Sequence, residues 1–293
     1  INSVSIADIN NDGRLDIVTA TGSNYQEDND PIIYYSKIYA FNHDGTLLPG
    51  WPADPDTGNG MNRTPRSPLV LVDLDQDGCL EIISGFLNKD DPNGWNNCFY
   101  VLKHDGTVFP GYYPIRTKSW NFAVASADMN GDGVYEIYSH GYRYKTNGLR
   151  DYTWELEKRI RDNVTSKLAF ADINNDGLPE YIYGSILGGE EMGIADKDGT
   201  VLPGWPAQAG SDGGDCIDCN PIAGDIDGDG DVEIFAGTFT TNNIYAWHHD
   251  GTPVEGFPLT TRDKNPRLAM ADLDNDGDIE LISSCLDSLI YVW

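Results

Sequence analysis

Residues 225–233 read Asp-Ile-Asp-Gly-Asp-Gly-Asp-Val-Glu, and the same nine-residue frame occurs six times in this chain of 293 residues. Aspartate stands at positions one and five, aspartate or asparagine at position three, glycine at position six, and aspartate or glutamate at position nine. So many carboxylates in one short segment repel one another unless a cation lies between them. The copies begin at Asp8, Asp73, Asp128, Asp172, Asp225 and Asp272. The frame therefore predicts six cation-binding loops.

Calcium is the cation that the donor atoms favour. Oxygen-only ligands argue against zinc and copper, and magnesium keeps its waters in preference to an all-protein cage. The glycine at position six suits the sharp bend of a calcium loop, because it has no Cβ. An EF-hand would need a bidentate glutamate at the twelfth position, which here holds Thr19, Ser84, Ser139, Tyr183, Ala236 and Ser283. We therefore expect about six Ca²⁺ ions in loops that are not EF-hands.

The expected ligands follow from the positions in the frame. Positions one, three, five and nine offer side-chain oxygens, and position seven offers its backbone carbonyl. In loop order, the predicted metal residues are Asp8, Asn10, Asp12, Arg14 and Asp16; Asp73, Asp75, Asp77, Cys79 and Glu81; Asp128, Asn130, Asp132, Val134 and Glu136; Asp172, Asn174, Asp176, Leu178 and Glu180; Asp225, Asp227, Asp229, Asp231 and Glu233; and Asp272, Asp274, Asp276, Asp278 and Glu280.

The spacing of the loops predicts the architecture. Successive loops start 65, 55, 44, 53 and 47 residues apart, which is the period of a propeller blade. A short β-rich run follows each loop, such as 80–83 or 232–235, so the position-nine acid is expected on the strand that leaves the loop. The chain is therefore predicted to be all-β: one β-propeller over residues 1–293, with six blades of mostly four antiparallel strands and a calcium loop between the first two strands of each blade. The approximate repeats are 1–55, 56–117, 118–162, 163–210, 211–262 and 263–293, with the last blade incomplete.

A second motif runs in phase with the loops. Asp-Gly-Thr follows His43, His104, Lys197 and His249, and an aromatic corner follows each copy at Trp51, Tyr112, Trp205 and Phe257. Asp-Gly between apolar runs is typical of a tight hairpin, so these histidines are interpreted as turn residues and the aromatics as packing between blades. The third repeat lacks Asp-Gly-Thr and has residues 144–148 (Tyr-Lys-Thr-Asn-Gly) in its place, so its outer strands are the hardest to assign.

These motifs resemble the FG-GAP/VCBS repeat family, which includes the calcium-binding β-propeller of integrin α subunits. The resemblance covers nearly the whole chain and implies that the calcium loop links the first two strands of a blade. The Asp-Gly-Thr turn followed by Gly-Trp-Pro, as in residues 198–206, is more similar to secreted microbial members of the family.

The negative charge of the chain argues against some classes of binding partner. The net charge is −28, and the four side-chain positions of the six loops hold 21 of the 47 acidic residues. An acidic surface disfavours nucleic acids and anionic membranes as partners, and no apolar run approaches the roughly 18 residues of a membrane span. Extracellular-type calcium loops with dissociation constants of about 0.1 to 1 mM would be empty in a resting cytosol. We therefore expect a secreted or cell-surface protein, and the start at Ile1 is consistent with a processed chain.

Two classes of function stay open. The first is a binding, adhesion or assembly module that holds a protein or carbohydrate ligand on the face of the variable loops, opposite the calcium loops. Assembly could use the incomplete last blade, because an exposed sheet edge invites another strand. The alternative is a secreted polysaccharide-active enzyme, such as a calcium-dependent polysaccharide lyase. The residues able to supply its base and charge neutralisation would be Lys118, His140, Tyr142, Arg143 and Glu190. No spacing singles these out, so no catalytic residue is predicted.

Overall fold

The computed structural model describes residues 3–25, 33–54, 63–65, 67–88, 97–111, 115–117, 124–156, 164–185, 191–209, 217, 220–238 and 241–293. The chain divides into two compact units. The first comprises Ile1–Ala127 with Asp132–Tyr152, and the second comprises Asp128–Gly131 with Thr153–Trp293. Each unit is described by itself.

Every regular element of the described residues is a β-strand, which confirms the predicted all-β class. The strands are β1 (Ser3–Ala7), β2 (Asp16–Tyr25), β3 (Ile33–Phe41), β4 (Arg63–Pro65), β5 (Val70–Val72), β6 (Glu81–Asn88), β7 (Asn97–Leu102), β8 (Ile115–Thr117), β9 (Ala125–Ala127), β10 (Glu136–Ser139), β11 (Tyr142–Tyr144), β12 (Arg150–Glu155), β13 (Val164–Ala171), β14 (Glu180–Ser185), β15 (Glu191–Ala195), β16 (Ala207–Gln208), β17 (Ile222–Gly224), β18 (Glu233–Gly237), β19 (Asn243–Trp247), β20 (Leu259–Thr260), β21 (Arg267–Ala271), β22 (Glu280–Ser284) and β23 (Ile290–Val292). No helix of the described residues is long and apolar enough to cross a membrane.

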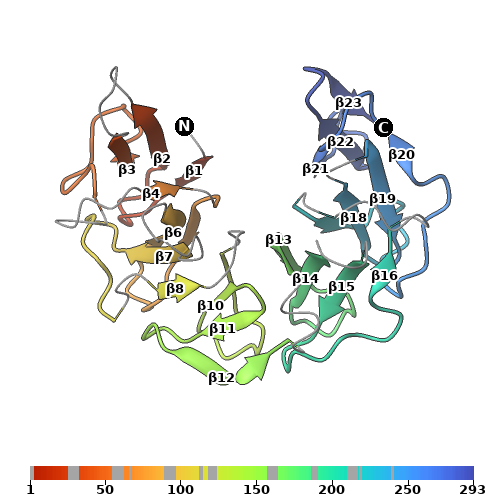
Figure 1. Ribbon diagram of the computed structural model, residues 1–293, viewed down its shortest axis with the longest axis horizontal. Coiled ribbons are helices and arrows are strands. Elements are labelled where there is room, and N and C mark those ends of the chain that lie inside the picture. Colours follow the sequence, from red (N-terminus) through yellow and green to blue (C-terminus); the bar gives the residue numbers. More distant parts are fainter. Residues whose placement is uncertain are drawn as a thin grey trace. The chain divides into compact units, whose positions relative to one another are not determined.

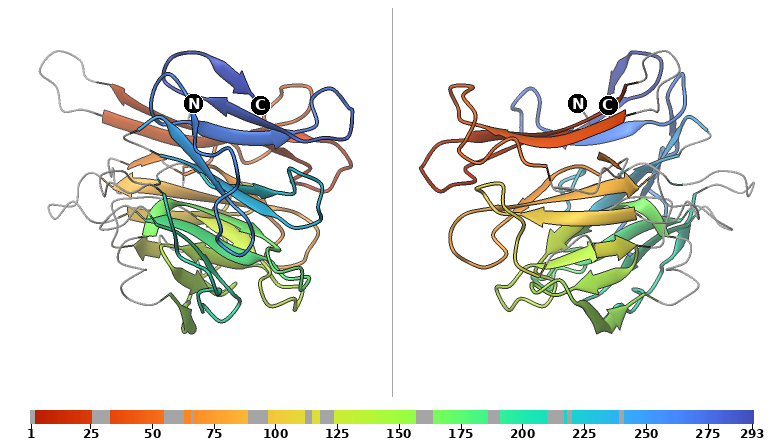
Figure 2. Two further views of the ribbon diagram at one scale, coloured as in Figure 1. Left: turned by 90° about the vertical axis from the view of Figure 1, so that its right-hand side faces the viewer. Right: turned by 60° about the vertical axis from the view of Figure 1, so that its left-hand side comes forward.

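The strands form six antiparallel sheets in chain order (Figure 1). The first sheet is β1-β2-β3, whose long β2 and β3 lie side by side in Figure 2, and the sixth is β21-β22-β23. Four strands each form the third sheet (β12-β11-β10-β9), the fourth (β13 to β16) and the fifth (β17 to β20). The second sheet has five, because β4 and β5 both pair with β6. Six sheets of mostly four strands agree with the repeat pattern.

The acidic loops and the strands meet at the same positions in all six sheets. The first strand of each pair ends at the residue before position one, as β5 does at Val72 before Asp73. The second strand begins at position nine, as β6 does at Glu81. The prediction that the position-nine acid stands on the strand leaving the loop is confirmed. Each loop is therefore held at both ends by a paired strand.

Apolar side chains on the second strand alternate between the two faces of a sheet. Ile82 packs with Val18 and Ile38 of the first sheet, whereas its neighbour Ile83 packs with Ile137 of the third sheet. In the second unit, Ile234 and Phe235 divide in the same way between the fourth and the sixth sheet. The first strands of successive sheets also touch, β1 with β5 and β5 with β9 in one unit, and β13 with β17 and β17 with β21 in the other. Within each unit, the sheets are thus stacked face to face.

Two of the four predicted aromatic corners, Trp51 and Trp205, link successive sheets, whereas Tyr112 lies outside the described residues. The indole Nε1 of Trp51 donates to the carbonyl of His104 at 2.9 Å, and that of Trp205 donates to the carbonyl of His249 at 3.0 Å. Both indoles are 7% exposed. The preceding glycines allow the close approach, because a Cβ on Gly204 would lie 1.9 Å from the carbonyl oxygen of Asp250. The corners at Trp51 and Trp205 therefore pack on the Asp-Gly hairpin of the next sheet.

The third repeat has the same hairpin turn with a different sequence. The amide of Gly148 donates to the carbonyl of Lys145, as Gly106 does to Lys103 in the second repeat. The amide of Leu149 donates to Oδ1 of Asn147 at 3.1 Å, which is the role of the turn aspartate elsewhere. Asn-Gly thus replaces Asp-Gly, and β11 and β12 are the outer strands that were hard to assign.

Candidate metal centres

The aspartate at position one closes each loop through backbone amides. In the first loop, Asp8 accepts the amide of Asp12 at 3.0 Å and that of Gly13 at 2.7 Å. The second, fourth and sixth loops repeat both bonds around Asp73, Asp172 and Asp272. These bonds require the chain to turn sharply at position six, where glycine has a positive φ. The sequence frame thus specifies the local backbone.

The aspartate at position five is oriented in all six loops by the amide of position seven. Its Oδ1 accepts this bond at distances from 2.8 Å at Asp77 to 3.0 Å at Asp12. Carboxylates converge in three of the six loops. Ligand atoms of three acids lie within 4.8 Å of one another in the second loop (Asp73, Asp75, Glu81), the fifth (Asp225, Asp227, Asp229) and the sixth (Asp272, Asp274, Asp276).

The acid at position nine is buried in the first, second, fourth and fifth loops and partly buried in the third and sixth. One oxygen of Glu81 accepts the amide of Leu74 at 2.9 Å, and the same bond links positions two and nine in the first, fourth, fifth and sixth loops. The other oxygen, Oε1 of Glu81, is buried and has no hydrogen-bond partner among the described residues, and the same holds for Oδ1 of Asp16. A buried anionic oxygen without a partner is costly, so each points to a cation.

Burial also shifts the acidity of these groups. It raises the pKa of Glu81 to about 7, with nearby Asp75 and Asp77 adding to the shift, and it raises the pKa values of Asp16 and Glu180 as well. A divalent cation would oppose this effect by favouring the charged form. The donors are carboxylate, amide and carbonyl oxygens only, which suits calcium. The predicted ligand residues fit the ion, although its binding stays a prediction.

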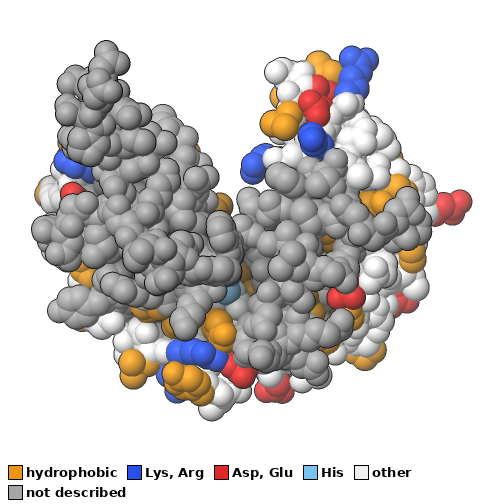
Figure 3. Space-filling model, viewed as in Figure 1, with side chains coloured by type: hydrophobic (Ala, Val, Ile, Leu, Met, Phe, Trp, Pro, Cys, Tyr) orange, Lys and Arg blue, Asp and Glu red, His pale blue; other side chains and the backbone are white. Residues whose placement is uncertain are grey.

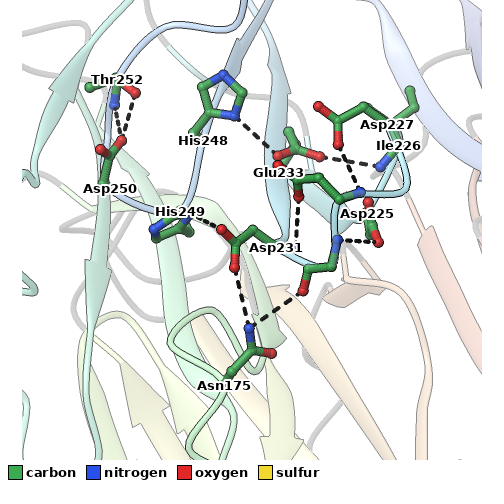
Figure 4. Close-up of polar contacts among 12 residues, drawn as sticks. Asn175, Asp225, Ile226, Asp227, Asp231, Glu233, His248, His249, Asp250 and Thr252 are labelled. Carbon is green, nitrogen blue, oxygen red and sulfur yellow. Dashed lines mark hydrogen bonds and ion pairs between the residues drawn. The ribbon is translucent and has the colours of Figure 1, made fainter.

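Position four is a feature of the loop that the sequence reasoning missed. It has a positive φ in every copy, at Asn11, Gln76, Gly131, Asn175, Gly228 and Asn275. Its side chain reaches the following loop: Nε2 of Gln76 donates to the carbonyl of Gly133 at 2.7 Å, and Nδ2 of Asn175 lies 3.5 Å from Gly230 O and Asp231 Oδ1 (Figure 4). The signal was present, because asparagine and glycine favour the left-handed region.

The hairpins bring further side chains to the loops. Nδ1 of His248 lies 3.2 Å from Oε1 of Glu233, and Nδ1 of His249 lies 3.3 Å from Oδ2 of Asp231 (Figure 4). In the second repeat, Nζ of Lys103 lies 3.1 Å from Oδ2 of Asp75. The prediction that the histidines serve the turns is therefore incomplete, since the imidazoles of His248 and His249 also contact loop acids.

Residues Asp128–Gly131 of the third loop belong to the second unit, and residues 132–136 belong to the first. In the second unit, Oδ1 of Asp128 accepts the amide of Gly131 at 2.7 Å. In the first unit, Oδ1 of Asp132 accepts the amide of Val134 at 2.8 Å, and Tyr138 Oη donates to Glu136 at 3.5 Å.

The candidate enzyme residues are engaged in structural contacts where the structure describes them. Arg143 donates from Nε and Nη2 to Oδ2 of Asp151, and His140 Nδ1 lies 2.9 Å from Ser139 Oγ in a tight turn. Tyr142 lies under the guanidinium of Arg150 at 3.8 Å from the ring centroid. Basic, acidic and hydrophobic side chains gather over β12 in Figure 3. Lys118 and Glu190 lie outside the described residues, as does most of the predicted variable-loop face.

Comparisons with known proteins agree with this arrangement. The profile described as FG-GAP-like repeat matches residues 8–84, 73–139 and 225–283. No curated protein matches the chain.

Solved structures resemble the fold. The biofilm matrix protein Bap1 of V. cholerae has a TM-score of 0.55 and 21% identity, over 88% of this chain and 38% of Bap1. The rhamnogalacturonan lyase PL11 of Bacillus licheniformis has a TM-score of 0.59 and 17% identity, over 99% of this chain and 55% of the lyase. The exotype rhamnogalacturonan lyase YesX has a TM-score of 0.53 and 16% identity, over 96% of this chain and 61% of YesX. The chain thus spans less than two thirds of each of these structures.

Proposed function

Because the chain belongs to the family of FG-GAP-like repeats, we propose that its six sheets form one calcium-stabilised β-propeller that acts outside the cell as a binding, adhesion or assembly module. The observation that carries the proposal is the repeated acidic loop, which has a buried position-nine carboxylate in four copies and converging carboxylates in three. Its role is structural, because all six loops share one frame of oxygen donors.

The calcium half of the proposal is tested by counting ions. Native mass spectrometry of the chain in calcium should give about six bound ions, and fewer than four would contradict the proposal. Asp227→Ala and Asp274→Ala should each remove one ion and leave the others, because repeat scaffolds distribute stability among neighbours. The exposed Glu255→Gln is the matched control, since it removes a negative charge outside the loops.

The binding half concerns the face of the variable loops, opposite the acidic loops. Loops on a rigid scaffold commonly carry recognition, and a protein or glycan is the proposed ligand. The Asp-Gly hairpins contact the acidic loops, so the two kinds of turn share one end of the sheets. The connections between the second and third strands lie at the other end. A glycan array, together with pull-down from matrix extracts, tests this assignment. Trp95, between β6 and β7, and Trp120, between β8 and β9, are assigned to this face by their place in the sequence and lie outside the described residues. Trp95→Ala and Trp120→Ala should weaken binding without lowering the melting temperature.

A polysaccharide lyase is the second candidate, because rhamnogalacturonan lyases are among the structures of similar fold. Incubation with acidic polysaccharides, followed by measurement of the ultraviolet absorbance of the unsaturated lyase product, separates the two candidates. Product formation that Arg143→Ala or His140→Ala abolishes would favour the enzyme and overturn the binding module.

Assembly would use the sixth sheet. Its strand β23 is the edge of a three-stranded sheet, and Ile290 and Val292 are 74% and 50% exposed on one face. A strand from another chain could pair with this edge. Sedimentation should then show association that depends on concentration, and Ile290→Lys should reduce it. A monomer at all concentrations would contradict this part of the proposal.

A further inference from the structure

The second loop differs from the fifth and sixth loops in having a lysine of the neighbouring hairpin against its acids. The hairpin begins with Lys103, whose amide and carbonyl close the turn with Thr107 and Gly106. The corresponding residues are Asn42, Lys145, Asp196 and His248 in the first, third, fourth and fifth repeats. Lysine at this place carries a permanent positive charge toward the side of the sheet that holds the acidic loop.

The ammonium group of Lys103 forms ion pairs with two predicted calcium ligands. Nζ is 3.1 Å from Oδ2 of Asp75 and 3.7 Å from Oδ2 of Asp77, at positions three and five of the loop. Its stem passes Phe109, with Nζ 5.3 Å from the ring centroid. The side chain is only 24% exposed, so the charge is held in place. Lysine and a metal ion would therefore compete for the same oxygens.

The fifth and sixth loops provide the comparison. They have the same number of carboxylates at the side-chain positions as the second loop, which is four. In both, the aspartate at position five belongs to the converging group (Asp229 and Asp276), whereas in the second loop Glu81 takes that place and Asp77 faces Lys103. Among the described residues, no lysine or arginine forms an ion pair with the acids of these two loops.

We propose that Lys103 is a built-in counter-ion of the second loop, which holds this loop closed without calcium and makes it a weaker calcium site than the fifth and sixth loops. The proposal rests on the calcium-binding function proposed above. A fixed positive charge repels a divalent cation that approaches the same carboxylates, and at about 4 Å this repulsion corresponds to a loss of affinity on the order of tenfold or more.

The second loop is hydrogen-bonded to both neighbouring loops, so its closure by Lys103 would affect the first unit as a whole. The amide of Leu80 donates to the carbonyl of Ile9 in the first loop at 2.9 Å, and Gln76 donates to Gly133 in the third. A second loop that stays closed at low calcium would keep these links between neighbouring loops. The first unit would then retain its local order while the fifth and sixth loops open.

Hydrogen exchange of the whole chain, followed by mass spectrometry at a series of free calcium concentrations, tests the proposal loop by loop. The amides of Asp77, Gly78 and Cys79 are bonded to carboxylates in the second loop and report on its closure. In the wild-type protein, peptides of the fifth and sixth loops should become protected at calcium concentrations on the order of tenfold or more below that of the second loop. In chelator, the second loop should exchange more slowly than the other two.

Lys103→Met keeps the length of the stem and removes the charge. It should lower the calcium midpoint of the second loop on the order of tenfold or more, and speed its exchange in chelator. Lys103→Arg should retain the wild-type behaviour. Lys145→Met is the matched control, because Lys145 opens the third hairpin but its Nζ lies 3.8 Å from Asp151, outside the acidic loops.

An unchanged midpoint in Lys103→Met would overturn the inference, as would a wild-type second loop that binds calcium as tightly as the fifth and sixth. If no loop changes its exchange with calcium, the proposed calcium function itself fails. The wild-type comparison among loops needs no variant, so a poorly folded Lys103→Met would not prevent a decision.

Discussion

Glu81 is a carboxylate inside the protein with one oxygen bonded to a backbone amide and the other without a partner among the described residues. At the scale of the residue, this is where burial and charge conflict most strongly. The group gains little from the fold in the absence of a cation, because desolvation favours its neutral form. Its environment therefore makes the free energy of unfolding depend on both pH and calcium.

The pH dependence has a definite sign. Burial raises the pKa of Glu81 from 4.5 to about 7 in the folded protein, so the protonated group stabilises the fold below about pH 4.5 and this contribution is lost as the pH rises through 7. The loss is at most about 3 kcal/mol. In chelator, the melting temperature of the wild type should fall between pH 5 and pH 7.5 more steeply than that of Glu81→Gln. The exposed Glu255→Gln should keep the wild-type slope, and equal slopes for all three proteins would contradict this account.

Trp205 allows the contribution of a single corner side chain to the free energy of unfolding to be measured. Its indole is buried among the apolar residues of the fourth and fifth sheets and donates to His249 O. Trp205→Ala should lower the free energy of unfolding by about 3 to 5 kcal/mol, through the lost contacts and the cavity. Trp205→Phe should cost less, since it keeps most of the volume. Tyr152→Ala, at a site that is 79% exposed, should stay within about 0.5 kcal/mol of the wild type in the same denaturant titration in calcium.

At the scale of the elements, the hairpin of one sheet and the corner of the preceding sheet form one contact. Gly204 has φ +87° and lies against the backbone of Asp250, whereas Gly256 has φ +89° and open space around the place of a Cβ. Both glycines therefore have a left-handed conformation, but only Gly204 lies too close to another backbone to accept a Cβ. This pair separates backbone strain from packing between sheets.

Gly256→Ala should cost about 1 to 2 kcal/mol, the price of a left-handed alanine. Gly204→Ala should cost at least about 2 kcal/mol more, because its Cβ would overlap the carbonyl oxygen of Asp250 and force the sheets apart. Thermal melts in calcium measure both. Equal losses would mean that the corner can move away from the hairpin without penalty.

At the scale of the whole molecule, calcium is the largest proposed contribution to stability. At about ten times the dissociation constant, each site stabilises the fold by about 1.4 kcal/mol, and six sites by roughly 8 kcal/mol. This is comparable with the entire stability of a typical domain, about 5 to 15 kcal/mol. A chelator should therefore lower the melting temperature by on the order of 15 °C or more relative to millimolar calcium. Magnesium at the same concentration should restore little of the loss, and a calcium effect of only a few degrees would show that the ions are not structural.

Much of the fold could be read from the chain, and particular residues show why. Position one and position nine coincide with the end and the start of paired strands in all six repeats, because the acidic frame and the β-rich run are both local patterns. The third hairpin was harder, since Asn147 replaces aspartate although the turn is the same. Position four was not predicted, because its common feature is a positive φ and not one residue type. Asparagine and glycine favour this conformation without requiring it.

The sequence by itself determined the strand class and the positions of the six acidic loops between paired strands, because each depends on residues within about ten positions of one another. The tertiary structure alone decided which hairpin residue reaches which acidic loop. Lys103 stands 28 residues beyond Asp75, and His248 stands 15 beyond Glu233, so only the pairing of the second and third strands brings them together. It also decided which carboxylate oxygens are buried without a partner, since burial depends on the neighbouring sheet. These non-local contacts make six similar loops chemically different from one another.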